Sequence, residues 1–343
     1  MKVLHIHFGK EGGAERFLVN LAHSLHGRGV EQRVLIRPGR TWKEEIGQYG
    51  QVYEGIFRRY SPSRFLFAAR LRLILRDFQP DVIMAWQMRA SRALPNYKKA
   101  RRISRLGDYP HHLNYYRNSE ILVCNTPDIA CKVGELGWQR GLEVITNFTY
   151  SLPGPVVSRE ALQTPEGAFV VVGMGRFVRR KGFHTLVQAM AKVENAYLWL
   201  LGEGIERENL ERQVDELGIR DRVRFAGWQT NVYSFLAAAD VLAVPSTHEP
   251  LGNVCLEGWC AEKPTVSTRS EGPSWMMTDE KDGLLVDCED FEALAAAIRR
   301  VRDDPALRQR LVEGGRQTMR ERFSEEAVTD AYLRLFSTGT SKP

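Results

Sequence analysis

Short apolar segments alternate with stretches of helical periodicity in the first part of the chain. The apolar segment 2–8 leads into the glycine-containing stretch 9–13. After it, apolar residues recur at the spacing of one helix face: Phe17, Leu18, Leu21, Ala22 and Leu25. Further strands are predicted at 32–36, 81–85 and 120–125, and a basic helix at 65–75. Strands that alternate with helices predict a parallel sheet with right-handed crossovers.

The same alternation starts again after a linker. The stretch 147–163 is rich in Pro, Ser, Gly and Thr and has weak periodicity, which is typical of a domain boundary. Beyond it, strands are predicted at 168–172, 197–201, 223–225, 241–244, 265–267 and 284–286. Helices are predicted at 183–193, 206–217, 232–238, 254–261, 291–302 and 327–336.

This pattern predicts an α/β protein with two doubly wound, Rossmann-like parallel sheets that face a cleft, where ligands bind at the carboxyl ends of the strands. The 343 residues, of which 43% are hydrophobic, are enough for two cores. The expected domains are 1–150 and 151–325, with the C-terminal segment 326–343 packing back on the first domain.

Composition narrows the compartment and the cofactor chemistry. The chain shows no secretory signal pattern and no apolar run near the length of about 18 residues that spans a bilayer, so a cytoplasmic protein is expected. Five cysteines without C-x-x-C spacing predict free, mostly buried thiols. His5 and His7 share a strand face but have no third ligand nearby, which favours packing or site lining over a metal site.

Basic residues are concentrated in one region of a chain whose net charge is +6. Between Arg58 and Arg105 there are thirteen Lys or Arg residues and only two acidic ones. Apolar residues are interleaved with them, namely Phe57, Tyr60, Phe65, Leu66 and Phe67. Three interpretations stay open: a solvated helix face, contact with an anionic acceptor or membrane surface, and nucleic-acid binding, for which no recognised motif is present.

The turn after the strand 168–172 has the composition of a phosphate site. It reads Gly173-Met-Gly-Arg-Phe-Val-Arg-Arg-Lys-Gly182 and precedes a helix. Gly173 and Gly175 let the backbone approach a ligand, the helix start offers amide groups, and Arg176 with Lys181 can neutralise a diphosphate. The third glycine of a dinucleotide fingerprint and the Gly-Lys-Ser/Thr of a P-loop are both missing.

A second group of polar residues follows the strand 241–244. Glu249 lies in the predicted loop and Glu257 about one turn into the next helix, so the two carboxylates do not form a glycosidase-like pair. They suit separate hydroxyl-binding roles instead. Amides at Gly252, Asn253 and Val254 are placed at the helix start, where an anion binds.

Taken together, the motifs resemble those of the family 4 glycosyltransferases of the GT-B fold, over essentially the whole chain. The resemblance rests on Gly12-Gly-Ala-Glu-Arg16, Gly175-Arg-x4-Lys-Gly182, Gly202-Glu-Gly204, Ala239-Asp-Val-x3-Pro-Ser246, Glu249-x7-Glu257, Lys263-Pro-x-Val266 and Asp282-Gly-Leu-Leu285. It implies a retaining transferase that takes a hexose from a nucleotide-diphosphate sugar, without a metal or other cofactor. The absence of an Asp-x-Asp motif agrees with this.

The resemblance also implies roles for individual residues. Arg176 and Lys181 would hold the donor diphosphate, Glu249 would contact the donor sugar, and Glu257 would bind the ribose. Further donor-binding positions are Gly12, Gly13, Gly175, Gly202, Trp228 at the nucleobase, Leu251, Gly252, Asn253 and Val254. Relatives carry a histidine in the first domain that touches the donor sugar; Asp108, His111 and His112 are the candidates for that role in this chain.

One segment departs from the family pattern. After Gly272-Pro273 the chain has Ser274-Trp275, where relatives often have a polar or acidic residue. The favoured function is hexose transfer to a saccharide or lipid-linked saccharide, such as lipopolysaccharide core, by a protein at the inner face of the cytoplasmic membrane. Two alternatives stay open: a soluble transferase acting on a small molecule or a glucan, and an inactive protein that binds a sugar nucleotide.

Overall fold

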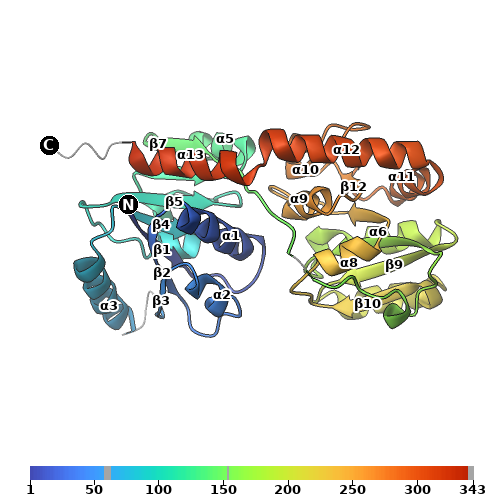
Figure 1. Cartoon of the computed structure of the whole chain (residues 1–343), viewed down its shortest axis with the longest axis horizontal. Coiled ribbons are helices and arrows are strands. Elements are labelled where there is room, and N and C mark those ends of the chain that lie inside the picture. Colours follow the sequence, from blue (N-terminus) through green and yellow to red (C-terminus); the bar gives the residue numbers. More distant parts are fainter. Residues whose placement is uncertain (58–62, 153, 339–343) are drawn as a thin grey trace. The chain divides into compact units, whose positions relative to one another are not determined.

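The computed structural model describes residues 1–57, 63–152 and 154–338. The chain divides into two compact units (Figure 1). The first unit is Met1–Phe148 with the segment that begins at Glu325, and the second is Thr149–Ser324. Both units contain a parallel sheet with helices, so the predicted fold class is confirmed.

The first unit is built on a sheet whose strands run in the order β3-β2-β1-β4-β5-β6-β7. Every pairing in it is parallel. The strand order reverses direction between β1 and β4, which makes that the switch point of the sheet. The strands are β1 (Lys2–His7), β2 (Glu31–Ile36), β3 (Gln51–Glu54), β4 (Val82–Trp86), β5 (Arg101–Leu106), β6 (Ile121–Cys124) and β7 (Gly141–Val144).

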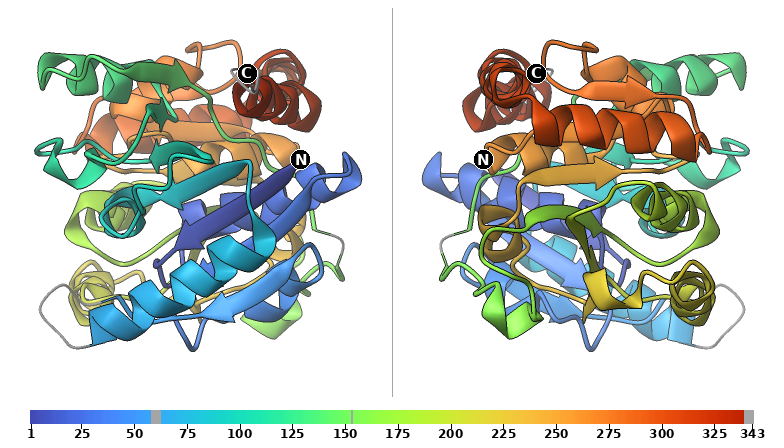
Figure 2. Two further views of the ribbon diagram at one scale, coloured as in Figure 1. Left: turned by 90° about the vertical axis from the view of Figure 1, so that its left-hand side faces the viewer. Right: turned by 90° about the vertical axis from the view of Figure 1, so that its right-hand side faces the viewer.

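Helices cover this sheet. They are α1 (Gly13–Gly27), α2 (Lys43–Gly47), α3 (Ser63–Phe78), α4 (Gln87–Ser91), the short 3-10 helix η1 (Asn114–Tyr116), α5 (Pro127–Glu135) and α13 (Glu325–Ser337). Helix α3 lies along the sheet (Figure 2). Its buried side chains pack with those of β1 and β4 in one cluster that includes Phe67, Leu71, Ile74, Phe78, Leu4, Ile6 and Ile83.

Helix α13 returns to the first unit from the far end of the chain. The hydroxyl groups of Ser24 and Thr329 are 2.8 Å apart, and Arg28 lies 3.1 Å from Asp330. The side chain of Tyr332 is fully buried and bonds to Arg105. Helix α13 is therefore part of the first unit, although the whole second unit lies between it and Phe148 in the sequence.

The second unit has the strand order β10-β9-β8-β11-β12-β13, again with parallel pairings and with its switch point between β8 and β11. Its strands are β8 (Phe169–Met174), β9 (Ala196–Leu201), β10 (Val223–Gly227), β11 (Val241–Val244), β12 (Thr265–Thr268) and β13 (Leu284–Val286). Its helices are η2 (Glu160–Leu162), η3 (Arg179–Lys181), α6 (Phe183–Ala191), α7 (Arg207–Glu216), η4 (Arg220–Arg222), α8 (Tyr233–Ala238), α9 (Asn253–Cys260), α10 (Glu271–Met276), α11 (Phe291–Asp303) and α12 (Pro305–Arg322).

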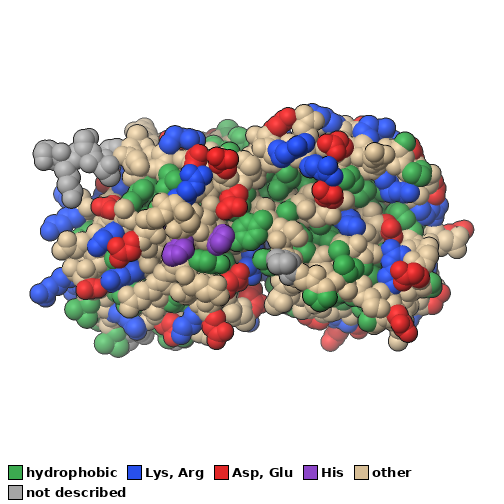
Figure 3. Space-filling model, in the orientation of Figure 1, with side chains coloured by type: hydrophobic (Ala, Val, Ile, Leu, Met, Phe, Trp, Pro, Cys, Tyr) green, Lys and Arg blue, Asp and Glu red, His purple; other side chains and the backbone are tan. Residues whose placement is uncertain are grey.

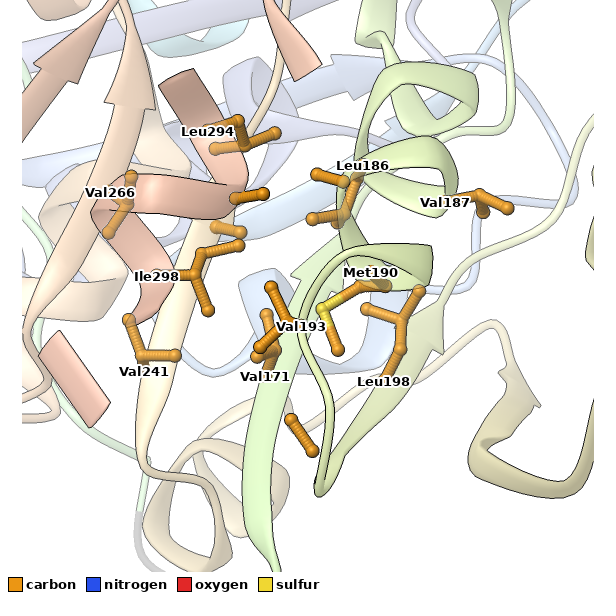
Figure 4. Close-up of a cluster of buried hydrophobic side chains, with 14 of the residues drawn as sticks. Val171, Leu186, Val187, Met190, Val193, Leu198, Val241, Val266, Leu294 and Ile298 are labelled. Carbon is orange, nitrogen blue, oxygen red and sulfur yellow. The ribbon is translucent and has the colours of Figure 1, made fainter. Parts of the chain in front are cut away.

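Apolar side chains from α6 and α11 meet those of the strands in the core of the second unit (Figure 4). Leu186 and Met190 of α6 and Ile298 of α11 are buried against Val171 and Val241. Burying a side chain of this size is worth about 1.5 to 3 kcal/mol, so this layer stabilises β8 and β11.

The structure adds elements that the sequence pattern did not predict. Strands β3, β5 and β7 and helices α2, α4 and α5 fall in stretches left without an assignment. Strand β5 reads Arg-Arg-Ile-Ser-Arg-Leu, and two of its arginines, Arg102 and Arg105, are buried. Its charges therefore concealed a central strand, because a buried strand is normally recognised by its apolar residues.

Two further observations concern composition. No helix within the described residues is long and apolar enough to cross a membrane. All five cysteines are free, but the expectation that most are buried was wrong: only Cys124 and Cys255 are buried, whereas Cys131 and Cys288 are exposed. Cys131 faces solvent because the buried face of α5 is formed by Ile129 and Val133.

Candidate functional site

The predicted phosphate turn and the predicted carboxylate loop both begin at the switch point of the second sheet. Gly175 and Arg176 directly follow β8, and the loop 245–252 directly follows β11. These two strands are hydrogen-bonded neighbours. In doubly wound sheets this is the edge where ligands bind. The main predicted residues are thus brought to one edge of one unit.

Glycines shape the turn after β8. Gly175 has a φ of 140°, a conformation that favours glycine, and its amide donates to the carbonyl of Leu201 at 2.9 Å. A Cβ on Gly202 would lie 1.9 Å from the carbonyl oxygen of Gly175. The close approach of these two backbones accounts for Gly202 without any ligand, while its predicted donor contact stays a prediction.

The two predicted diphosphate cations differ in their surroundings. Arg176 is exposed, and its side chain has no hydrogen bond or ion pair with the part of the chain that the structure describes. Lys181 is largely buried and forms a short ion pair with the carboxylate of Glu249. The structure therefore brings Lys181 and Glu249 together, which their separation in sequence did not predict.

Glu249 is held by several groups of its loop. Its Oε2 accepts a hydrogen bond of 3.2 Å from the hydroxyl of Ser246, in addition to the ion pair with Lys181. The amide of Thr247 donates to the carbonyl of Arg180 at 2.9 Å. The loop after β11 is thus tied to the turn after β8 through backbone as well as side chains. Only 12% of the Glu249 side chain is exposed.

Helix α9 starts at Asn253, one residue before the predicted range 254–261. It is preceded by Gly252 in the left-handed region, with a φ of 95°. Leu251 is buried, and Val254 lies in the first turn of the helix, where backbone amides point outward along the axis. Glu257 is half-buried one turn further on.

Cys255 is the buried thiol of this helix. Burial raises its pKa to about 12, and the neighbouring carboxylate of Glu249 acts in the same direction. A raised pKa favours the protonated thiol at neutral pH, and a protonated thiol is a poor nucleophile. The charges of Glu249, Lys181 and Glu257 are close enough to affect this pKa.

Trp228 follows β10, directly after Gly227 with its φ of 71°. Its side chain is 42% exposed, which is unusual for a tryptophan in this chain. An exposed aromatic ring at the carboxyl end of a strand is available for stacking. The predicted contact with a nucleobase stays a prediction.

The glycine loop of the first unit encloses a carboxylate. Glu15 is buried at the start of α1, and a Cβ on Gly9 would lie 1.5 Å from its Oε1. Gly12 has a φ of 151°, which favours glycine, and Gly13 begins α1. The side chain of Glu15 approaches to 3.3 Å from Nε2 of His7. The loop around Gly12 and Gly13 is therefore shaped by its own glutamate.

His5 and His7 are packing residues. Both are fully buried, and burial lowers the pKa of His5 to about 4 and that of His7 to about 3. His5 contacts the side chains of Gln32 and Trp86, and His7 accepts a hydrogen bond from the amide of Gly9 at Nδ1. Both imidazoles are neutral at neutral pH.

The segment after β5 carries the remaining candidates. Asp108 and His111 are exposed, and His112 is half-buried with its ring 4.2 Å from that of Tyr115. All three follow the carboxyl end of a strand, as a ligand-binding residue would. The choice among them for contact with a donor sugar stays open.

Sequence reasoning missed one group that contacts the predicted site. Glu271, the first residue of α10, is hydrogen-bonded to His248 and to the amide of Glu249. In the sequence, Glu271 stands directly before Gly272-Pro273, next to the Ser274-Trp275 that departs from the family pattern, and this position could have indicated it. No three His, Cys, Asp or Glu side chains are arranged to hold a metal within residues 1–57, 63–152 and 154–338; metal independence itself stays a prediction.

Comparisons with known proteins cover both units. Residues 11–148 match the family described as Glycosyltransferase Family 4, and residues 157–318 match the one described as Glycosyl transferases group 1. The structure of Anabaena HepE in complex with UDP-glucose has a TM-score of 0.86 and 21% sequence identity, and covers 98% of this chain and 99% of its own. WaaG, a glycosyltransferase involved in lipopolysaccharide biosynthesis, has a TM-score of 0.74 at 18% identity, covering 98% of this chain and all of its own. At 21% and 18% sequence identity, these similarities show that the chain shares the fold of the two structures.

Two relatives share much more of the sequence. The lipopolysaccharide core biosynthesis glycosyltransferase LpsD of Rhizobium meliloti is 65% identical over the full length of both chains. The lipopolysaccharide core biosynthesis glycosyltransferase LpsE of the same organism is 53% identical, again over the full length of both. With the fold, the loops at the switch point and these matches, the chain belongs to the family 4 glycosyltransferases and is an enzyme of that class.

Proposed function

We propose that this enzyme transfers a hexose from a nucleotide-diphosphate sugar to a saccharide of the lipopolysaccharide core, with retention of the anomeric configuration. The main support for the use of a nucleotide-sugar donor is the ion pair between Lys181 and Glu249 at the switch point of the second sheet. The names and full-length identity of the two Rhizobium relatives support the acceptor class.

In this proposal Arg176 and Lys181 bind the donor diphosphate. Arg176 is exposed and has no competing partner among the described side chains, whereas Lys181 must share its charge with Glu249. The incoming diphosphate takes hydrogen bonds from Lys181, and Glu249 then accepts a hydroxyl of the donor sugar. Amides at the start of α9 contribute further donors, and Glu257 binds the ribose.

The reaction needs no protein nucleophile. The bond between the anomeric carbon and the diphosphate oxygen breaks while the acceptor oxygen forms a new bond on the same face. The acceptor hydroxyl passes its proton to an oxygen of the departing diphosphate. Arg176 and Lys181 stabilise the charge that develops on this leaving group, so catalysis consists of electrostatic stabilisation and positioning.

The donor half is tested first by thermal shift. The protein is melted with UDP, GDP, ADP, CMP and TDP and with their common sugars, because a ligand that binds only the folded state raises the melting temperature. A selective rise with one nucleoside diphosphate is expected. No rise with any of them, at concentrations far above ordinary donor affinities, would favour an inactive binding protein of other specificity.

The acceptor is tested with the donor found in this way. Transfer of labelled sugar is measured to truncated lipopolysaccharide cores, to glycogen and to a set of small glycosides. Transfer to a core saccharide alone is expected. Transfer to glycogen or to small glycosides, with none to any core, would support the soluble transferase instead.

The proposal also includes a contact between α3 and the membrane surface. On this helix Phe65, Leu66 and Leu73 expose 64%, 76% and 65% of their surface. Exposed cations accompany them, and over α3, at the left of the view, Figure 3 shows Lys and Arg side chains beside hydrophobic ones. The exposed cations are Arg70, Arg72, Arg76, Lys98 and Lys99. Apolar side chains with adjacent cations are typical of contact with an anionic bilayer.

The basic region is smaller than its sequence suggested. Arg102 and Arg105 are buried, and Arg102 pairs with Glu120 at 2.7 Å. Arg58, Arg59 and Tyr60 lie outside the described residues. A cavity of about 280 Å³ next to α3 is lined by Arg72, Leu75, Arg76, Gln79, Tyr97 and Lys99, which leaves three cations around one opening.

Vesicle sedimentation tests this contact. Binding to vesicles of anionic and of neutral lipid is compared for the wild type, for Leu66→Ser with Leu73→Ser, and for Arg72→Glu with Arg76→Glu. We expect the wild type to prefer anionic vesicles. Both double variants should lose this preference, because one removes exposed apolar side chains and the other removes positive charges. Equal binding to both vesicle types would remove the membrane from the proposal and leave the transferase reaction untouched.

A further inference from the structure

Glu271 uses both of its carboxylate oxygens on the loop that carries Glu249. Its Oε1 lies 2.8 Å from Nδ1 of His248, and its Oε2 accepts a hydrogen bond of 3.0 Å from the amide of Glu249. One side chain therefore binds two successive residues of the loop. The side chain of Glu271 is 34% exposed and that of His248 is 31% exposed, so neither is simply part of the core.

The backbone around Glu271 makes the reverse contact. The amide of Gly272 donates to the carbonyl of Glu249 at 2.8 Å. A Cβ on Gly272 would lie 2.1 Å from the carbonyl oxygen of Leu251, so only glycine lets α10 approach the loop this closely. Both the amide and the carbonyl of Glu249 are thus bonded to the first two residues of α10.

The other side of the loop is bonded to the phosphate turn. The amide of Thr247 and the carboxylate of Glu249 bond to Arg180 and Lys181 respectively. Glu249 is therefore held on one side by the phosphate turn, through its carboxylate, and on the other side by α10, through its backbone amide and carbonyl. Removing the Glu271 carboxylate leaves the ion pair between Glu249 and Lys181 in place, but it removes the hydrogen bond that holds the backbone amide of Glu249.

The electrostatics agree with a carboxylate at this place. Burial raises the pKa of Glu271, but the hydrogen bond from His248 and those from backbone amides outweigh it, so the pKa lies below its usual value. Glu271 is therefore ionised at neutral pH, and its hydrogen bonds to the loop are charge-assisted.

We propose that Glu271 is a positioning residue for the donor sugar: it fixes the backbone of Glu249 so that this carboxylate meets the sugar when the diphosphate occupies Lys181. This inference rests on the proposed role of Glu249. It places the effect of Glu271 in the orientation of the sugar, not in the binding of the nucleotide, because within the described part of the chain neither Arg176 nor Lys181 forms a hydrogen bond or ion pair with Glu271.

A double-mutant cycle tests the proposal. Glu271→Ala is made in the wild type and in the Glu249→Ala background, and kcat, the KM of the sugar donor and the Kd of the free nucleoside diphosphate are measured. In the wild type, kcat is expected to fall about tenfold, the effect of one lost charge-assisted hydrogen bond, with an unchanged Kd for the diphosphate. In the Glu249→Ala background, no further loss is expected.

Glu271→Gln serves as the conservative variant and as the safeguard for folding. Its carbonyl still accepts from the Glu249 amide, so it is expected to recover most of the kcat lost in Glu271→Ala. Glu280→Ala is the matched control, because Glu280 also forms an ion pair in this unit, with Arg300 at 2.8 Å, but on an exposed surface. It is expected to leave all three constants unchanged.

The outcomes separate the two proposals. Equal losses of kcat from Glu271→Ala in both backgrounds, or a parallel loss of diphosphate affinity, would overturn the positioning role. Full activity of Glu249→Ala on its own would instead overturn the role of Glu249 in the proposed function. If Glu271→Ala does not fold, the same cycle is run with His248→Ala, which removes the other partner of the Glu271 carboxylate; its non-additivity with Glu249→Ala is expected, and additivity contradicts the proposal.

Discussion

The basic residues at the carboxyl ends of the two sheets differ in their surroundings. In the second unit, Arg176 is exposed, and Lys181 is largely buried with Glu249 as its ion-pair partner. In the first unit, His7 and Arg105 are buried almost completely. Arg105 donates to the hydroxyl of Tyr332 and to the side chain of Asn147, and lies 4.6 Å from the ring of Phe17. An arginine is thus exposed at one sheet and enclosed at the other.

The difference indicates which charges can serve a ligand. A cation that is already buried and hydrogen-bonded has little left to offer, and removing it disturbs the core. Arg176 is exposed and can bind an incoming phosphate without first losing a partner, whereas Lys181 has to exchange Glu249 for the phosphate. The two cations that the proposal assigns to the donor diphosphate therefore lie in the second unit, while Arg105 joins α13 to the segment that leads out of the first unit.

The largest expected effect tests the enclosed cation. Arg105→Ala leaves the Tyr332 hydroxyl and the Asn147 side chain without their partner and opens a cavity against Phe17. We expect the free energy of unfolding to fall by about 2 to 5 kcal/mol, measured by urea denaturation. Because Tyr332 belongs to α13, this helix should also become accessible to limited proteolysis before the rest of the first unit.

A matched control accompanies this variant. Arg89 is exposed and comes from the same basic region, so Arg89→Ala should change the unfolding free energy by less than about 0.5 kcal/mol. Similar losses in both variants, or an unchanged proteolysis pattern at α13, would contradict the architectural role of Arg105.

The next effect concerns the two cations of the second unit, Arg176 and Lys181. Lys181→Ala and Arg176→Ala should each weaken donor binding and turnover by about 1.5 to 3 kcal/mol, the value of a lost charge-assisted hydrogen bond. Only Lys181→Ala should also change the protein without ligand, since it leaves Glu249 without its ion pair. Donor titration by calorimetry measures the first quantity and thermal melting of the free protein the second. Unaltered turnover in either variant would remove that residue from the site.

The donor loops could be predicted because their chemistry is local in the sequence. Gly175, Arg176 and Lys181 stand within one turn, and Gly252 directly precedes the helix start at Asn253. Parallel strand order then brings the turn and the loop to the same edge. The ion pair between Lys181 and Glu249 depends on that order and on the loop conformation, which residue spacing does not specify.

Buried charged residues, and contacts between residues far apart in the sequence, could not be predicted in the same way. Strand β5 looked like part of a basic surface because its arginines give no apolar pattern, and only the fold shows that Arg105 meets Tyr332, 227 positions away. Glu271 was overlooked for a related reason. An acidic residue was sought after Gly272, whereas the one that contacts the Glu249 loop stands before it.

The enclosed histidines give a pH dependence to the first unit. Burial lowers the pKa of His5 to about 4, and burial with the nearby Arg40 and Arg105 lowers that of His7 to about 3, against 6.5 for an ordinary histidine. The unfolded chain therefore binds protons that the folded chain does not, and stability present above pH 6.5 is lost as the pH falls toward 4. The expected slope is about 1.4 kcal/mol per pH unit for each histidine.

Urea midpoints between pH 7 and pH 4.5 measure this slope. The wild type is compared with a variant that carries His5→Gln and His7→Gln, which should be less stable at pH 7 but should lose less stability on acidification. Parallel curves for the two proteins would mean that the acid sensitivity lies elsewhere, for instance in the carboxylates.

The smallest expected effect concerns Trp228 at the open end of β10. Because its side chain is 42% exposed, Trp228→Ala should change the melting temperature little, but should weaken nucleotide binding by about 0.5 to 1.5 kcal/mol if the ring stacks on the base. Trp228→Phe keeps an aromatic face and should recover part of the affinity. Leu217→Ala, which truncates another exposed apolar side chain of the second unit, should have no effect on binding. Equal nucleotide affinity in Trp228→Ala and the wild type would show that the base binds away from this ring, and that exposure of an aromatic side chain at the end of the edge strand β10 does not by itself mark a ligand contact.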